Sequence, residues 1–152
     1  MRLTDHFHLA HLTASETAER KGIANSPLPE HVDNLRRLAA GLEQVQALLG
    51  HPLEISSGYR CAELNRAVGG TDASQHTLGM AADFTCPQFG SPVEIVAAIQ
   101  ASDIPFDQCI LEFGRWVHIS FSSSPRGRVL SIHDSGEGYL DGLRDADGNV
   151  LA

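Results

Sequence analysis

The chain has 152 residues and a mass of 16.4 kDa, which is the size of one ordinary domain. Its composition, with 42% hydrophobic and 20% charged residues, excludes the disordered and fibrous classes of protein. A formal net charge of −8, with the few lysines and arginines scattered along the chain, argues against a nucleic-acid-binding surface.

The first half of the chain predicts two helices and a strand. Residues 13–20 have a possible N-cap in Thr13 or Ser15 and acidic residues close behind, which predicts a short helix. Residues 31–49 carry apolar side chains at three- and four-residue steps and end at a glycine, which predicts the longest helix. The following proline cannot continue this helix, and residues 53–57 predict the first strand.

The second half of the chain alternates between short helices and strands. Residues 59–68 predict a helix closed by two glycines, and the end of the segment 76–84 predicts a strand. A Ser-Pro pair begins a helix over residues 91–101. The hinge at Gly114 and Arg115 predicts that the two strands beside it form a hairpin. Three late strands are predicted at residues 108–113, 116–121 and 128–132.

Helices early in the chain and strands late in it predict an α+β fold. We expect a small, mostly antiparallel sheet with helices packed on one side. No repeat or long linker divides the chain, so residues 1–133 are expected to form a single domain. The Gly- and Asp-rich residues 134–152 are expected to form an irregular tail, because their DADGN sequence lacks the rest of a calcium-loop pattern.

Two groups of potential metal ligands receive a structural interpretation. Cys61, Cys86 and Cys109 are widely spaced and form no Cys-x-x-Cys pair, so we expect small apolar packing residues rather than a disulfide framework or a structural zinc site. The closely spaced histidines in DHFHLAHL, residues 5–12, suggest a second metal site, but an N-terminal packing segment is the favoured interpretation.

The most informative sequences are SGYRCAELNRAVGGTDASQHTLGMAADF, at residues 57–84, and ILEFGRWVHISF, at residues 110–121. They resemble the zinc D-Ala-D-Ala carboxypeptidases and their relatives, which include vancomycin-resistance dipeptidases, phage L-alanyl-D-glutamate endopeptidases and the hedgehog signalling domain. The resemblance covers residues 3–133. It implies a hedgehog-like fold, a zinc cofactor and hydrolysis of peptide bonds in bacterial peptidoglycan.

The resemblance also implies the zinc ligands. In this family two histidines and an aspartate hold the metal, and six residues separate the first histidine from the aspartate. HTLGMAAD supplies His76 and Asp83 at this spacing, and the Trp-x-His sequence in the late strand supplies His118. Three nitrogen and oxygen ligands that leave one position open are typical of a catalytic zinc site rather than a structural one.

Hydrolysis at such a site also needs a general base, and Glu112 is the candidate. Some members of the family carry the acid three residues before the last histidine, where this chain has Arg115, which cannot act as a base. Others carry it six residues before, which matches Glu112. Its position between Leu111 and Phe113 also predicts partial burial, which would raise its pKa toward that of a working base.

The resemblance assigns further residues to the substrate. Arg60 matches an arginine that binds and polarises substrate, and a guanidinium offers fixed donors to a developing oxyanion or to a carboxylate. Ser74 matches a serine that contacts substrate, and Trp116, on the same strand face as the last histidine, is expected to line the cleft. Asn65 and Gln75 either bind a peptide group or close a turn.

These interpretations leave several functional questions open at this stage. The enzyme could be a carboxypeptidase or an endopeptidase, and the alternative is a zinc-bearing binding module without turnover or a degenerate phage structural domain. We expect a monomer with a peptidoglycan peptide as its partner, and neither nucleic acid nor membrane. Residues 1–20 lack the apolar run of a signal peptide, so we expect synthesis in the cytoplasm and action on the wall after lysis or another form of export.

Overall fold

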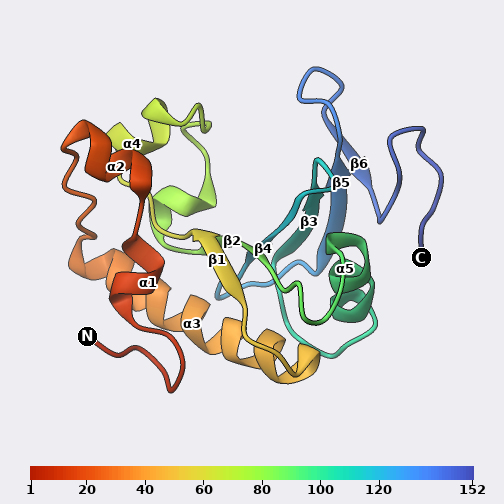
Figure 1. Ribbon diagram of the computed structural model, residues 1–152, viewed down its shortest axis with the longest axis horizontal. Helices are drawn as coiled ribbons and strands as arrows, with labels where there is room; N and C mark the ends of the chain where they lie inside the picture. Colours follow the sequence, from red (N-terminus) through yellow and green to blue (C-terminus); the bar gives the residue numbers. More distant parts are fainter.

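A six-stranded sheet lies at the centre of the protein, whose computed structural model describes residues 1–152 (Figure 1). The helices are α1 (Leu9–Thr13), α2 (Glu16–Lys21), α3 (Pro29–Leu49), α4 (Ala62–Ala67) and α5 (Pro92–Gln100), and η1 (Gln75–Leu78) is a single 3-10 turn. The strands are β1 (Glu54–Ser57), β2 (Ala81–Thr85), β3 (Gln108–Glu112), β4 (Trp116–Ser120), β5 (Arg128–Ile132) and β6 (Tyr139–Asp141).

The strands lie in the order β1-β2-β4-β3-β5-β6. Every neighbouring pair is antiparallel except β3 and β5, which run parallel. The connection from β4 to β5 therefore passes around β3 before the chain rejoins the sheet. The predicted α+β fold with a mostly antiparallel sheet is confirmed, and the parallel pair of β3 and β5 makes the sheet mixed.

Alternation along the strands gives the sheet two different faces. Leu111 of β3 and Val117 of β4 point into the main hydrophobic core, which they share with the apolar sides of α3 and α5. Their neighbours Ile110 and His118 point to the opposite face, where Ile110 forms a small separate cluster with two residues of β5. The helices α3 and α5 thus cover one face (Figure 1), and the second face is open to a cleft.

The two covering helices form where the sequence predicts them. In α3 the residues at three- and four-residue steps, Leu35, Leu38, Leu42 and Val45, are fully buried. In α5 the Ser91 hydroxyl accepts the Glu94 amide and the Glu94 carboxylate accepts the Ser91 amide, a reciprocal cap at the predicted start. No helix in the protein combines the length and the apolar character needed to cross a membrane.

The N-terminal region differs from the prediction of one helix over residues 13–20. Two short helices occupy the region, because Thr13 uses its hydroxyl to bind the Leu9 carbonyl at the end of α1, and the following Ala14 is extended. Ser15 then caps α2 by accepting the Ala18 amide, as one of the two predicted caps. Propensity alone does not reveal α1, because five residues are too few to show a period.

The C-terminal residues are not an irregular tail as the sequence predicts. They contain β6, which pairs antiparallel with β5, so that Leu140 lies opposite Ser131. Leu143, which follows β6, is only 2% exposed and belongs to the main core. Gly138 and Gly142 flank the strand with φ of 77° and 85°, conformations that glycine adopts without strain. A three-residue strand between glycines carries too little alternation to be predicted.

Candidate metal centre

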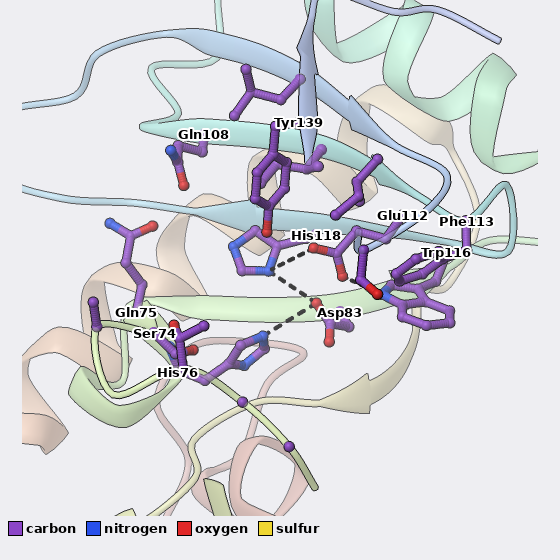
Figure 2. A pocket seen from close by; sticks show the side chains of 18 of the residues that line it. Ser74, Gln75, His76, Asp83, Gln108, Glu112, Phe113, Trp116, His118 and Tyr139 are labelled. Atoms are coloured by element: carbon purple, nitrogen blue, oxygen red, sulfur yellow. Dashed lines mark hydrogen bonds and ion pairs between the residues drawn. The ribbon is translucent and has the colours of Figure 1, made fainter. Parts of the chain in front are cut away.

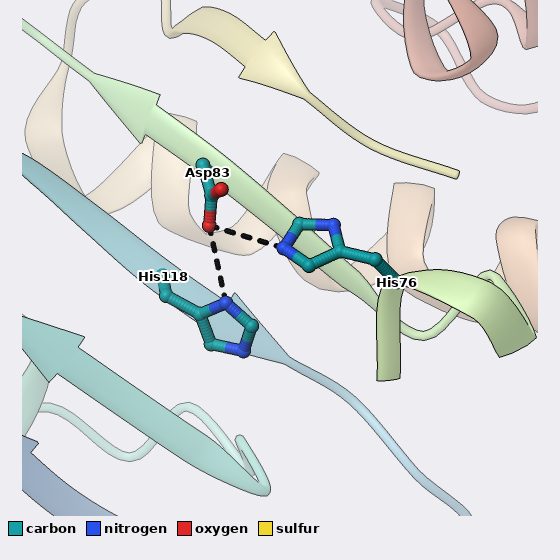
Figure 3. Close-up of side chains that lie close together, drawn as sticks. All are labelled: His76, Asp83 and His118. Atoms are coloured by element: carbon teal, nitrogen blue, oxygen red, sulfur yellow. Dashed lines mark hydrogen bonds and ion pairs between the residues drawn. The ribbon is translucent and has the colours of Figure 1, made fainter. Parts of the chain in front are cut away.

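Three elements bring His76, Asp83 and His118 together (Figure 3). His76 comes from η1, Asp83 from β2, and His118 from β4, where it lies directly opposite Asp83 in the strand register. The Asp83 Oδ1 lies 3.2 Å from His76 Nε2 and 3.1 Å from His118 Nδ1. All three side chains are buried, and one nitrogen or oxygen of each lies within 4.8 Å of the others. This group could hold a metal ion.

Backbone and hydroxyl groups around the three residues fix their orientation. His76 Nδ1 lies 2.7 Å from the Gly58 carbonyl, which can only accept, so Nδ1 donates to that carbonyl and Nε2 is the ring nitrogen that faces Asp83. The Ser56 hydroxyl donates to the Asp83 carbonyl at 3.2 Å, at the bulge where β1 leaves register with β2. The contact with Gly58 is of the kind that orients a metal-binding imidazole, and the contact with Ser56 holds the main chain at Asp83.

The charges of the group favour a cation at its centre. Burial opposes ionisation of Asp83, but hydrogen bonds from the two histidines outweigh it and hold the pKa of Asp83 well below its ordinary value. Burial likewise opposes a charge on His118, yet the hydrogen bond with Asp83 raises the pKa of His118 above its ordinary value. A buried carboxylate is therefore ionised between two imidazoles, a donor set of two nitrogens and one oxygen that fits a divalent metal ion.

A cleft of about 740 Å³ opens over this group on the uncovered face of the sheet. One wall consists of residues from β3, β5 and β6, and the other consists of Arg60 and the segment 68–75. His76, Asp83 and His118 lie between the walls, with Glu112 and Trp116 beside them (Figure 2). A substrate entering the cleft would therefore meet a bound metal from the open side.

Glu112 lies close to the group of His76, Asp83 and His118, as the predicted hairpin requires. The turn between β3 and β4 places Phe113 and Gly114 at φ of 58° and 65°, and Glu112 pairs with Trp116 across it. The Glu112 Oε2 lies 4.0 Å from His118 Nδ1. Burial raises the pKa of Glu112 above its ordinary value, although the charge of His118 acts in the opposite direction. A carboxylate with this environment is suited to general base catalysis.

A family model of peptidase M15 matches residues 5–120, which include the metal group and Glu112. The chain belongs to the peptidase M15 family. Membership implies a hydrolase of the metallopeptidase type with a hedgehog-like fold, in agreement with the sheet and the buried donor group. The comparison with curated protein sequences finds no match. The strands β5 and β6 of this M15 protein lie beyond the matched residues.

Trp116 has a second contact in the M15 cleft that sequence reasoning missed. It lines the cleft, as expected, and its indole Nε1 also donates a hydrogen bond of 2.7 Å to Glu112 Oε1 (Figure 2). This bond holds one carboxylate oxygen at the rim and directs the other toward His118. The paired positions of the two residues across the hairpin are the signal that could have revealed this contact.

Arg60 and Ser74 lie in the cleft wall opposite β3. Burial lowers the pKa of Arg60 from its ordinary value, against the opposing effect of the Asp83 and Glu112 carboxylates. Its Nη2 lies 3.4 Å from the Ser74 hydroxyl, while its buried Nε has no protein partner. Ser74 also accepts the His76 amide at the start of η1. Arg60 lines the cleft, so its guanidinium could donate to a molecule there, and Ser74 helps to position His76.

Asn65 and Gln75, which are expected either to bind a peptide group or to close a turn, have different surroundings. Asn65 is only 1% exposed and donates to the Thr71 carbonyl, so it closes the loop that forms the cleft wall. A Cβ at Gly70 would come within 2.1 Å of the Asn65 Oδ1, which explains the glycine at this close approach. Gln75 lines the cleft and donates at 2.8 Å to Asp107.

The N-terminal histidines form no second metal group. Phe7 and Leu12 are buried in the core, whereas His6, His8 and His11 lie at the surface. His6 contacts Glu43 through Nδ1 at 2.7 Å. The segment packs the start of the chain onto α3, in agreement with the favoured interpretation.

Asp107 ties the two walls of the cleft together. It is 2% exposed, accepts two side-chain hydrogen bonds of 2.8 Å from Arg126, and also accepts the Gln75 amide. The bonds from Arg126, against the effect of burial, lower the pKa of Asp107 to about 2. Because the folded pKa lies below the unfolded value, this contribution to stability is present above the unfolded pKa and lost as pH falls through the folded one.

Replacing Asp107 with asparagine should therefore destabilise the protein at neutral pH. We expect a loss of about 1–2 kcal/mol in unfolding free energy at pH 7, discounted for the solvent around the half-exposed Arg126. Urea unfolding at a series of pH values checks this. The difference between the two proteins should shrink between about pH 4 and pH 2, and a difference that is independent of pH would contradict the explanation.

Proposed function

We propose that this M15 protein is a zinc peptidase that hydrolyses a peptide bond in the stem peptides of bacterial peptidoglycan. The observation that carries the proposal is the buried His76, Asp83 and His118 group with Glu112 beside it at the floor of an open cleft. The peptidoglycan substrate follows from the sequence resemblance to cell-wall peptidases. Such a protein acts at the wall, reached through lysis of the producing cell or through export.

The donor set supports zinc as the metal. Two imidazole nitrogens and one carboxylate oxygen, with open space on the cleft side, correspond to the three protein ligands of hydrolytic zinc sites. When bound, a zinc ion would act as a Lewis acid that lowers the pKa of a water molecule and polarises the peptide carbonyl.

The proposed chemistry assigns the proton transfers to Glu112. Its carboxylate takes a proton from water as the water oxygen bonds to the carbonyl carbon, and it returns this proton to the nitrogen as the carbon–nitrogen bond breaks. The products are a carboxylic acid and an amine, which become a carboxylate and an ammonium group by proton transfer, and Glu112 ends in its starting state. Arg60, from the opposite wall, donates hydrogen bonds to the oxygen on which negative charge develops.

The alternative is a zinc-bearing binding module without turnover. Two observations favour the enzyme. Glu112 lies close to the metal group with a pKa that its partial burial raises, and the half-buried Arg60 lines the same cleft from the opposite wall. A binding module requires neither a base nor an oxyanion donor at this point.

Digestion of defined muropeptides followed by mass spectrometry tests the proposal. Loss of the terminal D-Ala from a pentapeptide would assign a carboxypeptidase, and separation of L-Ala from D-Glu would assign an endopeptidase. Unchanged masses after incubation of zinc-loaded protein with a panel of stem peptides would instead support the binding module.

Replacing Trp116 with phenylalanine should lower the fraction of Glu112 that is deprotonated at a given pH without removing the carboxylate. The indole hydrogen bond lowers the pKa of Glu112, so its loss raises that pKa further. A base must be deprotonated to act, and we therefore expect the acidic limb of the pH profile of kcat/KM to move to higher pH. Without the indole hydrogen bond the Glu112 carboxylate is no longer held in one orientation, which should also lower kcat by about 10-fold. A pH–rate profile identical to that of the wild type would contradict the positioning role.

A further inference from the structure

The wall of the cleft built by β5 and β6 lies outside the residues that the family model matches. Tyr139, the first residue of β6, stands on this wall (Figure 2). The protein has two tyrosines, and Tyr59 is only 4% exposed, packs against His31 and is not among the residues that line this cleft. Tyr139 is therefore the one phenol available in the cleft.

The sheet register places Tyr139 in the same row as the proposed base. Trp116 of β4 pairs with Glu112 of β3, Glu112 pairs with Ile132 of β5, and Ile132 pairs with Tyr139 of β6. Residues paired across a sheet point to the same face, and two strand spacings amount to roughly 10 Å. A tyrosine side chain leaning over the intervening Ile132 spans much of this distance. Figure 2 shows the Tyr139 ring directed from β6 into the space above the metal group.

The Tyr139 hydroxyl is a free donor in this position. No hydrogen bond to another protein group fixes it, and the influences on it are burial and the negative charges of Glu112 and Asp83. All three raise the pKa of Tyr139 above its ordinary value, so the phenol stays protonated at neutral pH. A protonated hydroxyl that faces two carboxylates across an open cleft can donate to a third group between them.

We propose that Tyr139 is a catalytic residue that donates a hydrogen bond to the carbonyl oxygen of the peptide bond being cleaved. This assignment rests on the proposed peptidase function. Arg60 approaches the cleft from the opposite wall, so the two side chains would hold the substrate carbonyl from both sides. The hydroxyl keeps its proton throughout, and the bond strengthens as negative charge develops on the oxygen.

The test compares Tyr139→Phe with wild-type protein, both loaded with zinc, on the muropeptide that the wild type cleaves. Phenylalanine keeps the ring and removes only the donor. We expect kcat to fall by about 100-fold, the effect of losing one donor to a developing oxyanion, with KM changed by less than about 3-fold. Tyr59→Phe is the matched control, because it removes the other phenol at a site outside the cleft, and its kcat should equal that of the wild type.

A second readout is independent of turnover. A phosphinate dipeptide mimics the tetrahedral transition state, and its Kd from calorimetry should rise by at least about 10-fold in Tyr139→Phe. Zinc content and the thermal midpoint should stay unchanged. Equal kcat and equal phosphinate affinity would overturn the assignment, and so would loss of zinc or a lowered midpoint, which would make Tyr139 a structural residue. A wild-type protein that cleaves no stem peptide would contradict the proposed function itself, whereas an active wild type with an equally active variant contradicts only the role of Tyr139.

Discussion

Replacing His118 with alanine is expected to abolish both stoichiometric zinc binding and peptide hydrolysis. His118 supplies one of the three donors, and its Nδ1 lies 3.1 Å from the Asp83 carboxylate. Loss of an outer partner alone typically weakens a metal site by about 10–100-fold, so loss of a direct ligand should exceed about 100-fold. Elemental analysis after dialysis, together with competition against a chelating dye, measures this change.

The control for this variant is His51→Ala. His51 is exposed and lies outside the metal group, so its replacement should leave one zinc ion per chain. Thermal unfolding of His118→Ala without metal shows whether the fold persists. A folded His118→Ala protein that keeps one tightly bound zinc would rule out the assigned ligands.

Replacing Glu112 with glutamine is expected to remove turnover and leave the metal in place. Glutamine keeps the size of the side chain and can still pair with Trp116, but it cannot accept the proton from water. General base catalysis is worth about 10²–10⁴-fold, so kcat should fall by that factor. Zinc content should match the wild type, because Glu112 is not one of the three donors. The rate of amine release from stem peptides measures the effect.

Glu63→Gln is a suitable control, since Glu63 is an exposed residue of α4 that does not line the cleft. It should retain the wild-type rate. If Glu112→Gln retained full activity with normal zinc, another group would have to accept the proton, and the assignment of the base would be wrong.

Much of the fold could be predicted from the sequence because its strongest elements carry local signals. The buried stripe of α3 shows a clear helical period, α5 begins at a reciprocal cap, and Phe113 and Gly114 form a tight hairpin turn. By contrast, β6 has three residues and depends on pairing with β5, and α1 has five residues. Elements this short are set by tertiary contacts rather than by their own sequence.

The candidate site likewise contains residues that the sequence reveals and contacts that it does not. His76, Asp83 and His118 could be found from spacing within a matched family pattern, and the structure brings them together. Sequence spacing does not reveal the hydrogen bond between Trp116 and Glu112 or the position of Tyr139. Both depend on cross-strand register. Register is fixed by the assembled sheet, which places side chains from distant parts of the chain in a single row.

Amine release from purified peptidoglycan is the most direct test of the central claim. Zinc-loaded wild-type protein should release new amino groups in proportion to time and enzyme. Glu112→Gln protein with the same zinc content should release fewer by a factor of about 10² or more. Equal release by the two proteins, or no release by the wild type at full zinc occupancy, would contradict the account of this cleft as a metal-dependent peptidase site.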